Sequence, residues 1–419
     1  MTVYPDKQDT ALKDLRKQSA GKIDGVFLFL TLMLLAVGLV MLMSASYARA
    51  FYEKDPPFSV ITHQFEMALI SIVVLFIASL FPEKFFQKIA TPLLLATTAL
   101  LALVLIIGQT GGGGKRWIDF GFVEFQPSEL AKFSVILSYA KLTCVLSPKL
   151  MKLHADPRYS TDSRFRFRTD LNLTVIPYVL ILMIVCMLLV AEPHVSACVI
   201  FVIITGGIML QAGTKFMYLL ILIAIAAVAA VVMYKTGFPR DYIKERVIVW
   251  RDTWAERPVI EGDSPEAIAS QEWHKIAEDK GHQTRQSLIA IGSGGLTGLG
   301  LGQSRQKHLY LPEEHNDFIF AVVCEELGFI GAVLIMILFA LLIVRGYWLA
   351  LHSASKFSAL VIGGITTQIA IQVVLNVAVV TNLFPATGIS LPFFSDGGTA
   401  LICQMGAIGI ILALSKNKN

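Results

Sequence analysis

Asp317 is the residue whose type and position most clearly indicate chemistry. It lies in the segment LPEEHNDFIF (311–320), where a polar stretch meets an apolar one that carries Glu325 and Glu326 near its start. Carboxylates at membrane depth are costly and are retained mainly where they face a cavity, which indicates acid/base or cation chemistry. Asp is also favoured at helix N-termini, where it caps free N–H groups. The local sequence leaves both interpretations open.

A carboxylate and an amine three residues apart form a second candidate. Glu129 and Lys132 follow Pro127 and Ser128, which together mark a helix start. The spacing places both side chains on one helical face. Because a charge inside a membrane span must face the protein interior, we expect the two to neutralise each other. The pair is either structural or part of the lining of a polar cavity.

Two adjacent cations, Lys115 and Arg116, follow four glycines and precede Trp117. The pattern is not a nucleotide-binding loop, because Arg rather than Ser or Thr follows the Lys. It suits an anionic lipid headgroup, with ordinary interfacial anchoring as the alternative. A second glycine run at 292–302 also lacks a nucleotide-binding pattern, and it predicts a loop packed closely against the protein.

Two further segments are unusual for loops. Glu192-Pro193-His194 predicts a tight turn between two apolar runs, and 385–398 is too apolar to remain in water. Irregular backbone of that kind is tolerated only where protein or a cavity covers it. We therefore expect these two segments to converge with 115–132 and 292–317 on one face.

The elements that must position these residues are membrane-spanning helices. Of the 419 residues, 55% are hydrophobic and only 16% are charged, well below the roughly 25% charged of soluble proteins. Apolar runs long enough to cross about 30 Å of hydrocarbon recur along the chain. The fold class predicted is all-α, a polytopic membrane protein with about ten spans: 25–46, 64–81, 89–108, 128–146, 174–191, 195–211, 217–234, 318–344, 357–381 and 398–415.

The distribution of Lys and Arg predicts the orientation of these spans. With the N-terminus inside, the inner segments hold 18 Lys and Arg and the short outer segments hold 4, as the positive-inside rule requires. Both tails, 1–24 and 416–419, are then cytoplasmic, and 25–415 is one membrane domain. The long loop 235–316, before the eighth span, lies outside, with a short surface helix expected near 242–250. The net charge of +4 reflects this bias and gives no evidence for nucleic-acid binding.

The same segments resemble the SEDS family of shape, elongation, division and sporulation proteins, which includes FtsW, RodA and SpoVE. The matching pieces are GKRWI (114–118), QPSELAK (126–132), LIAIGSGG (288–295), LPE (311–313) with DFIF (317–320) and EELG (325–328), and LPF (391–393) with Ser395 and Gly397-Gly398. Asn376 and TNLFP (381–385) look closer to the division and sporulation members. His194 and Asp396 depart from the family's usual Asp and Tyr.

The resemblance implies a peptidoglycan glycosyltransferase of the cytoplasmic membrane that polymerises lipid II on the outer face. It also implies a class B penicillin-binding protein as partner and Asp317 as the essential aspartate. Asp317 would act as a general base or would bind a divalent cation such as Mg²⁺ or Mn²⁺. The residues expected at the substrate are Lys115, Arg116, Glu129, Lys132, Arg305, Lys307, His315 and Ser395.

Two other functions also fit a polytopic protein of this kind. A lipid II flippase would use Glu129, Lys132 and Asp317 along a transport path. A scaffold would mainly recruit the penicillin-binding protein. The candidate residues gather on the outer side, which favours the polymerase, since a flippase needs a path that reaches both faces.

Overall fold

The computed structural model describes residues 21–53, 59–111, 114–119, 121, 124–236, 242–251 and 281–416, with a few isolated positions between 252 and 280. In these parts, nine helices are long and apolar enough to cross a membrane, and a tenth apolar helix, Val195–Gln211, is shorter. The prediction of an all-α polytopic protein with about ten spans is confirmed. The middle of the loop 255–282 lies largely outside the described residues.

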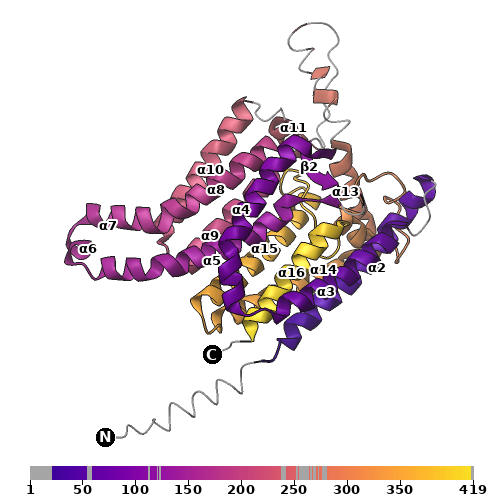
Figure 1. Cartoon of the computed structure of the whole chain (residues 1–419). Coiled ribbons are helices and arrows are strands. Elements are labelled where there is room, and N and C mark those ends of the chain that lie inside the picture. Colours follow the sequence, from indigo (N-terminus) through magenta and orange to yellow (C-terminus); the bar gives the residue numbers. More distant parts are fainter. Residues whose placement is uncertain are drawn as a thin grey trace.

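The helices run in chain order, with a small sheet between the third and fourth long ones (Figure 1). The bounds are α2 Gly25–Glu53, α3 Ser59–Leu80, α4 Glu83–Ile107, α5 Pro127–His154, α6 Pro157–Thr161, α7 Ser163–Asp170, the π-helical turn η1 Leu171–Val175, α8 Ile176–Ala191, α9 Val195–Gln211, α10 Phe216–Thr236, α11 Tyr242–Arg251, α13 Gly281–Gly294, α14 Ile319–Leu351, α15 Lys356–Val380 and α16 Gly398–Ser415.

The three strands are β1 Gln109–Gly111, β2 Gly114–Asp119 and β3 Glu124–Phe125, paired antiparallel in the order β1-β2-β3. β1 and β2 pair as a hairpin with Gly111 opposite Gly114, where residues without a Cβ suit close backbone pairing. The hairpin brings Arg116 and Trp117 over the end of the helix bundle.

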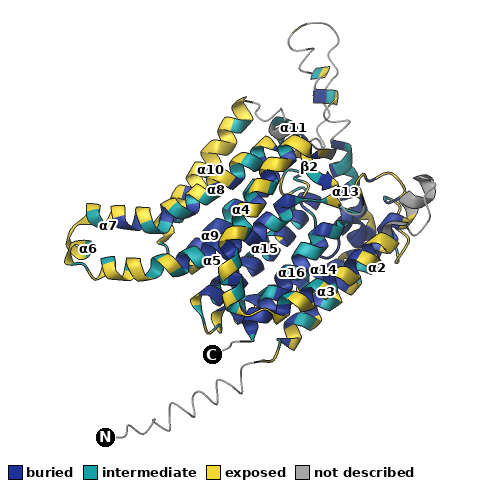
Figure 2. Ribbon diagram, viewed as in Figure 1, coloured by how far each residue is buried: buried dark blue, intermediate teal, exposed yellow. Residues whose placement is uncertain are grey.

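The centre of the bundle is formed by α5, α15 and α16. Between 61 and 72% of the residues in their apolar windows are buried, against 11% for α10, which lies at the periphery (Figure 2). A helix that is apolar all round and buried needs packing partners on every side, which the central helices have. The apolar side chains exposed on α10 are those expected to contact lipid.

Both described ends of the chain lie at the same end of the bundle. Asp24, just before α2, accepts hydrogen bonds from Arg345 near the end of α14 at 2.7 and 3.1 Å. Lys416, just after α16, donates to the carbonyl of Ser79 at the end of α3 at 2.8 Å. The relative placement of the termini agrees with the predicted topology. Which side is cytoplasmic stays a prediction from the charge distribution.

The segment 147–173, expected only as a basic inner loop, is largely helical. The helix α5 continues eight residues beyond its expected end, and α6, α7 and η1 follow. Asp156 and Asp162 each accept backbone N–H groups at the helix starts they precede. These caps stabilise the first turns of the two short helices. The predicted span 128–146 was too short because α5 continues as a helix into the polar residues that follow it.

Candidate active site

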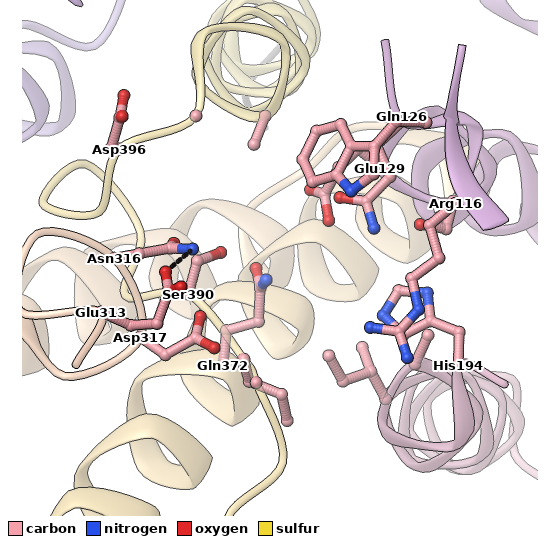
Figure 3. A pocket seen from close by; sticks show the side chains of 18 of the residues that line it. Arg116, Gln126, Glu129, His194, Glu313, Asn316, Asp317, Gln372, Ser390 and Asp396 are labelled. Carbon is pink, nitrogen blue, oxygen red and sulfur yellow. Dashed lines mark hydrogen bonds between the residues drawn. The ribbon is translucent and has the colours of Figure 1, made fainter. Parts of the chain in front are cut away.

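A cavity of about 340 Å³ is lined in part by residues of β2 and α11, which lie at the end of the bundle opposite the start of α2 and the end of α16 (Figure 1). All four stretches that were predicted to converge contribute to it, together with residues of α11, α13 and α15. Its lining includes Arg116, Trp117, Gln126, Ser128, Glu129, Lys132, His194, Arg246, Gln283, Glu313, Asn316, Asp317, Gln372, Gly388, Ile389, Ser390 and Asp396. Asp317, Glu313 and Asn316 lie on one side, and Arg116, His194, Gln126 and Glu129 lie on the other (Figure 3).

Asp317 lies at the wall of this cavity and does not cap the following helix. The N-cap position of α14 is Phe318, and no side chain caps the helix there. The Asp317 carboxylate instead faces the segment 385–398, where a Cβ on Gly388 would lie 3.2 Å from Oδ2. Gly388 also has a φ of 66°, so two independent constraints favour glycine next to the carboxylate. The capping interpretation is wrong.

The pKa of Asp317 is raised to about 6, because burial disfavours the charged form and Glu313 adds like charge. The cations Arg246 and Arg116 act in the opposite direction. A carboxyl group with a pKa near neutrality is largely ionised at pH 7 and is still basic enough to accept a proton. This environment suits a general base better than that of a fully solvated Asp.

The loop before Asp317 is fastened to the start of α14 by two buried glutamates. Glu325 accepts from the hydroxyl of Ser304 at 2.5 Å and from the backbone N–H of Arg305 at 3.0 Å. Glu326 accepts from the Lys307 ammonium at 2.8 Å. Both carboxylates are almost fully buried, and bonds to charged groups in such surroundings are strong. Glu325 and Glu326 therefore hold the loop that carries Asp317.

The glycine run 292–302 makes this attachment close, as the sequence predicted. The N–H groups of Leu299 and Gly300 bond to the carbonyls of Glu325 and Glu326 at 3.0 Å. A Cβ on Gly298 would lie 2.1 Å from the carbonyl oxygen of Glu326, and one on Gly328 would lie 2.2 Å from the Gly298 nitrogen. Neither position has space for any other residue.

Three cations line the cavity with Asp317: Arg116, Lys132 and Arg246. Arg116 donates to the carbonyl of Pro193, and Arg246 donates to the carbonyl of Ala386. Each arginine is thus oriented by a turn or loop from another part of the chain. The surface helix α11 was predicted from the sequence, but Arg246 within it was not identified as a site residue. Arg246 is one of three cations on this short helix, and the sequence does not show which face of the helix turns toward the cavity.

His194 lies next to Arg116 in the cavity (Figure 3). Burial, followed by the positive charges of Arg116, Lys132 and Arg246, lowers its pKa to about 3. The imidazole is therefore neutral at physiological pH and adds no charge to the cationic side. It remains a hydrogen-bonding group, and its Nδ1 is buried without a partner in the described structure.

The predicted ion pair between Glu129 and Lys132 is present, with 2.8 Å between Lys132 Nζ and Glu129 Oε2. Both residues line the cavity, and the Lys132 side chain is only 3% exposed. Gln372 lines the cavity beside them, and Gln368 and Gln404 extend the polar region inward: Gln368 donates to Gln372 and, at 3.3 Å, to Gln404. These three glutamines were not predicted from the sequence, because each is an isolated polar residue within an apolar helix.

The other predicted site residues lie elsewhere. Lys115 is exposed on the hairpin, and Arg305 is exposed on the loop. Lys307 is buried and bonded to Glu326 and Ser44. His315 lies 3.6 Å from Glu314, and the Ser395 hydroxyl donates to the carbonyl of Asn316 and accepts from the N–H of Leu391. None of the five lines the cavity, and substrate binding by them stays a prediction.

The carboxylates of the cavity do not assemble into a metal site by themselves. In the described parts of the chain, no group of three or more His, Cys, Asp or Glu residues is placed to hold a metal ion. Hard divalent cations take six or more oxygen ligands, so any cation near Asp317 needs most of its ligands from water or a substrate.

Comparison with known proteins decides the family. A family model described as cell cycle protein, covering FtsW, RodA and SpoVE, matches residues 25–419. The chain belongs to this family. The chain is 34% identical to the stage V sporulation protein E of Bacillus subtilis, over 94% of the chain and 97% of that protein. It is 32% identical to a probable peptidoglycan glycosyltransferase FtsW of Geobacter sulfurreducens, over 94% and 95% respectively.

Solved structures of similar proteins support the fold of this FtsW/RodA/SpoVE chain. One belongs to a study of how a peptidoglycan synthase complex coordinates polymerization and crosslinking, with 25% identity, a TM-score of 0.70 and coverage of 94% of this chain and 97% of that chain. The rod shape determining protein RodA of Thermus thermophilus matches with a TM-score of 0.62 at 24% identity, over 94% and 97%. The similarity to the RodA structure supports only the fold.

Proposed function

We propose that this protein is a peptidoglycan glycosyltransferase that polymerises lipid II into glycan strands during cell division or sporulation. The observation that carries the proposal is one cavity in which Asp317 shares the lining with Arg116, Arg246 and Lys132. Such a cavity combines a basic carboxylate with an anion-binding side. The names of the relatives, a sporulation protein and glycosyltransferases, support the same activity.

In the proposed reaction, the 4-hydroxyl of one lipid-linked disaccharide attacks the anomeric carbon of another. The bond between that carbon and the pyrophosphate oxygen breaks, and undecaprenyl pyrophosphate leaves. Asp317 accepts the hydroxyl proton as the new glycosidic bond forms. Positioned bases contribute roughly a hundredfold to ten-thousandfold, and the raised pKa of Asp317 suits this role.

The cationic side of the cavity is proposed to hold the departing pyrophosphate. Arginine offers planar pairs of N–H donors that match phosphate oxygens, and Lys132 adds a point charge next to Glu129. Negative charge develops on the leaving oxygen in the transition state, and fixed cations stabilise it most at that point. A neutral His194 leaves this charge balance unchanged.

A divalent cation such as Mg²⁺ or Mn²⁺ remains a proposal. Asp317 and Glu313 supply carboxylate oxygens at the cavity wall, but the protein alone does not furnish a complete ligand set. Pyrophosphate oxygens would have to provide the remainder. The mechanism above requires no step through a metal.

We also propose a class B penicillin-binding protein as the membrane partner and the outer face of the cytoplasmic membrane as the site of reaction. The likeness to a chain of a synthase complex supports the partner. The charge distribution supports the orientation. A cysteine at Thr236, exposed at the cavity end of α10, should react with an impermeant thiol reagent added to intact cells. One at Ser160 in α6 should not, and the reverse labelling would overturn the orientation.

The decisive experiment is reconstitution of the purified protein with lipid II, with and without the penicillin-binding protein. We expect glycan polymer from the native chain and at least roughly a hundredfold less from Asp317→Asn under the same conditions. The flippase and scaffold alternatives predict no polymer from either. A native chain that forms no polymer even with its partner would therefore refute the proposal.

A further inference from the structure

The end of α5, together with α6 and α7, forms an arm that projects from the side of the bundle near the termini (Figure 1). We define this arm as residues 147–170. Most of its residues are exposed, and Thr169 and Asp170 at its end are buried (Figure 2). The function proposed above does not require it, since no residue of the arm lines the cavity.

Every acidic residue in the arm is already used within the protein. Asp156 caps α6 and pairs with Arg158 at 2.8 Å, and Asp162 caps α7. Asp170 is buried, where it accepts from Lys215 at 2.6 Å and from the Tyr159 hydroxyl at 2.8 Å. The Asp170 contacts fix the arm to the start of α10, while Asp156 and Asp162 remain accessible and are each hydrogen-bonded within the arm itself.

The remaining cations of the arm have no such partners. Lys149, Lys152, Arg164, Arg166 and Arg168 are exposed, and none of them forms an ion pair in the described part of the chain. Apolar side chains accompany them: Met151 is 73% exposed and Phe167 is 46% exposed. Unpaired cations mixed with exposed apolar groups are typical of surfaces that bind at the headgroup level of a membrane.

The length of α5 places the arm at that level. Its 28 residues span roughly 42 Å at about 1.5 Å per residue, while the hydrocarbon layer is about 30 Å thick. Because α5 begins at the outer cavity, its far end reaches the opposite headgroup layer. The charge count assigns that layer to the cytoplasm, where anionic lipids give the surface its negative potential.

We propose that the arm is a binding surface for anionic phospholipid headgroups of the inner leaflet. Arg164 and Arg168 lie four residues apart and therefore on one face of α7. They would bind headgroup phosphates, while Met151 and Phe167 contact the acyl boundary. The proposal is independent of the polymerase activity, because it concerns a surface remote from the cavity.

The test compares lipid binding by two matched double variants of the full-length protein in neutral detergent. Arg164→Gln/Arg168→Gln removes two arm cations. Lys235→Gln/Lys275→Gln removes two exposed cations from the other side. Affinities for phosphatidylglycerol and for phosphatidylcholine are measured by native mass spectrometry. Each arm cation should contribute about fivefold in affinity for the anionic lipid, so the arm variant should lose about twenty-five-fold and the control should match the native protein.

Several results would overturn the proposal. One is equal binding of both lipids by the native protein, and another is an equal loss in both variants. A third is unchanged lipid binding in the arm variant with lost binding of a polyglutamate peptide, which would identify an acidic protein as the occupant. Polymerisation of lipid II by the arm variant in the same detergent should remain at the native level, so failure of the glycosyltransferase proposal would be recognised separately.

Discussion

The side-chain amide of Asn376 donates a hydrogen bond of 2.8 Å to the backbone carbonyl of Asp317. The same amide donates a second bond of 2.8 Å to the carbonyl of Ile389. One buried side chain on α15 thus fixes both the residue that carries the proposed base and the loop that lies across from it. Asn376 touches no reacting atom in the proposed mechanism, and we assign it as a positioning residue.

Replacing this amide should impair catalysis more than substrate binding. In Asn376→Asp the new carboxylate cannot donate and would face two carbonyl oxygens. We expect kcat for polymerisation to fall roughly tenfold to hundredfold through misplacement of Asp317, with KM for lipid II nearly unchanged. Asn382→Ala, which removes a bond to Thr253 away from the carboxylate, serves as the control. Equal effects of both changes on kcat would contradict the positioning role.

Asp317→Asn should remove activity without removing the fold. Asn has nearly the same size, and Asp317 makes no helix cap that the change would disturb. Because the amide cannot accept the hydroxyl proton, polymerisation should fall by roughly a hundredfold or more. Yield, thermal unfolding and binding of the penicillin-binding protein are measured in parallel. A variant that polymerises at the native rate would exclude Asp317 as the base.

The raised pKa of Asp317 predicts two pH dependences. Activity should fall as the pH drops through about 6, where the carboxylate becomes protonated. The free energy of unfolding should change in the opposite direction. Because the pKa of Asp317 is higher in the folded protein than its unfolded value of about 3.9, protonation favours the folded state, and this stabilisation is complete below that value. It is lost as the pH rises through about 6. Asp317→Asn lacks this loss, so it should be more stable than the native chain at pH 7.5 and no more stable at pH 4. Equal unfolding temperatures at pH 7.5 would contradict the shift.

Breaking the Glu129–Lys132 pair should be costly because Lys132 is buried. Glu129→Ala leaves its ammonium without the carboxylate, at a cost of roughly 3 kcal/mol or more, measured as lost yield and earlier unfolding. Arg158→Gln breaks an ion pair of equal length on the exposed arm and should leave yield and unfolding nearly unchanged, because solvent screens the pair. Glu129→Leu/Lys132→Met should restore yield. Restored polymerisation in that double variant would show that the pair acts only in folding.

Arg246 should affect both substrate turnover and the acid limb of the pH profile. Arg246→Ala removes a donor to the proposed pyrophosphate, so kcat/KM should fall roughly tenfold to hundredfold. It also removes a cation that lowers the pKa of Asp317, so the acid limb should move to higher pH. Arg246→Lys should retain the position of that limb while losing part of the rate. An unmoved limb in Arg246→Ala would contradict the electrostatic coupling.

Much of the scaffold could be predicted because membrane spans have a strong signal. About twenty consecutive apolar residues allow few alternatives in a bilayer, and the i,i+3 spacing of Glu129 and Lys132 was enough to predict their contact. The segment 385–398 was predicted to be buried because its composition left no other stable location, and Leu391 and Phe394 are indeed buried.

The contents of the cavity were harder to predict. Several cations lie in the outer loops, and the folding of these loops over the bundle decides which of them line the cavity. Sequence periodicity does not predict the conformation of such loops. Lys307 and Arg246 look alike in the sequence, yet Lys307 is bonded to Glu326 and Arg246 faces the cavity. The capping alternative for Asp317 was equally plausible locally. It failed because α14 begins after Phe318, a boundary set by tertiary contacts of the preceding loop.

The contact between Gly298 and Gly328 has a consequence for how this sequence can change over time. Each glycine occupies the space that a Cβ on the other would need, and both have positive φ. No substitution at one position can be compensated at the other, because no residue is smaller than glycine. These two positions should therefore remain glycine across lineages.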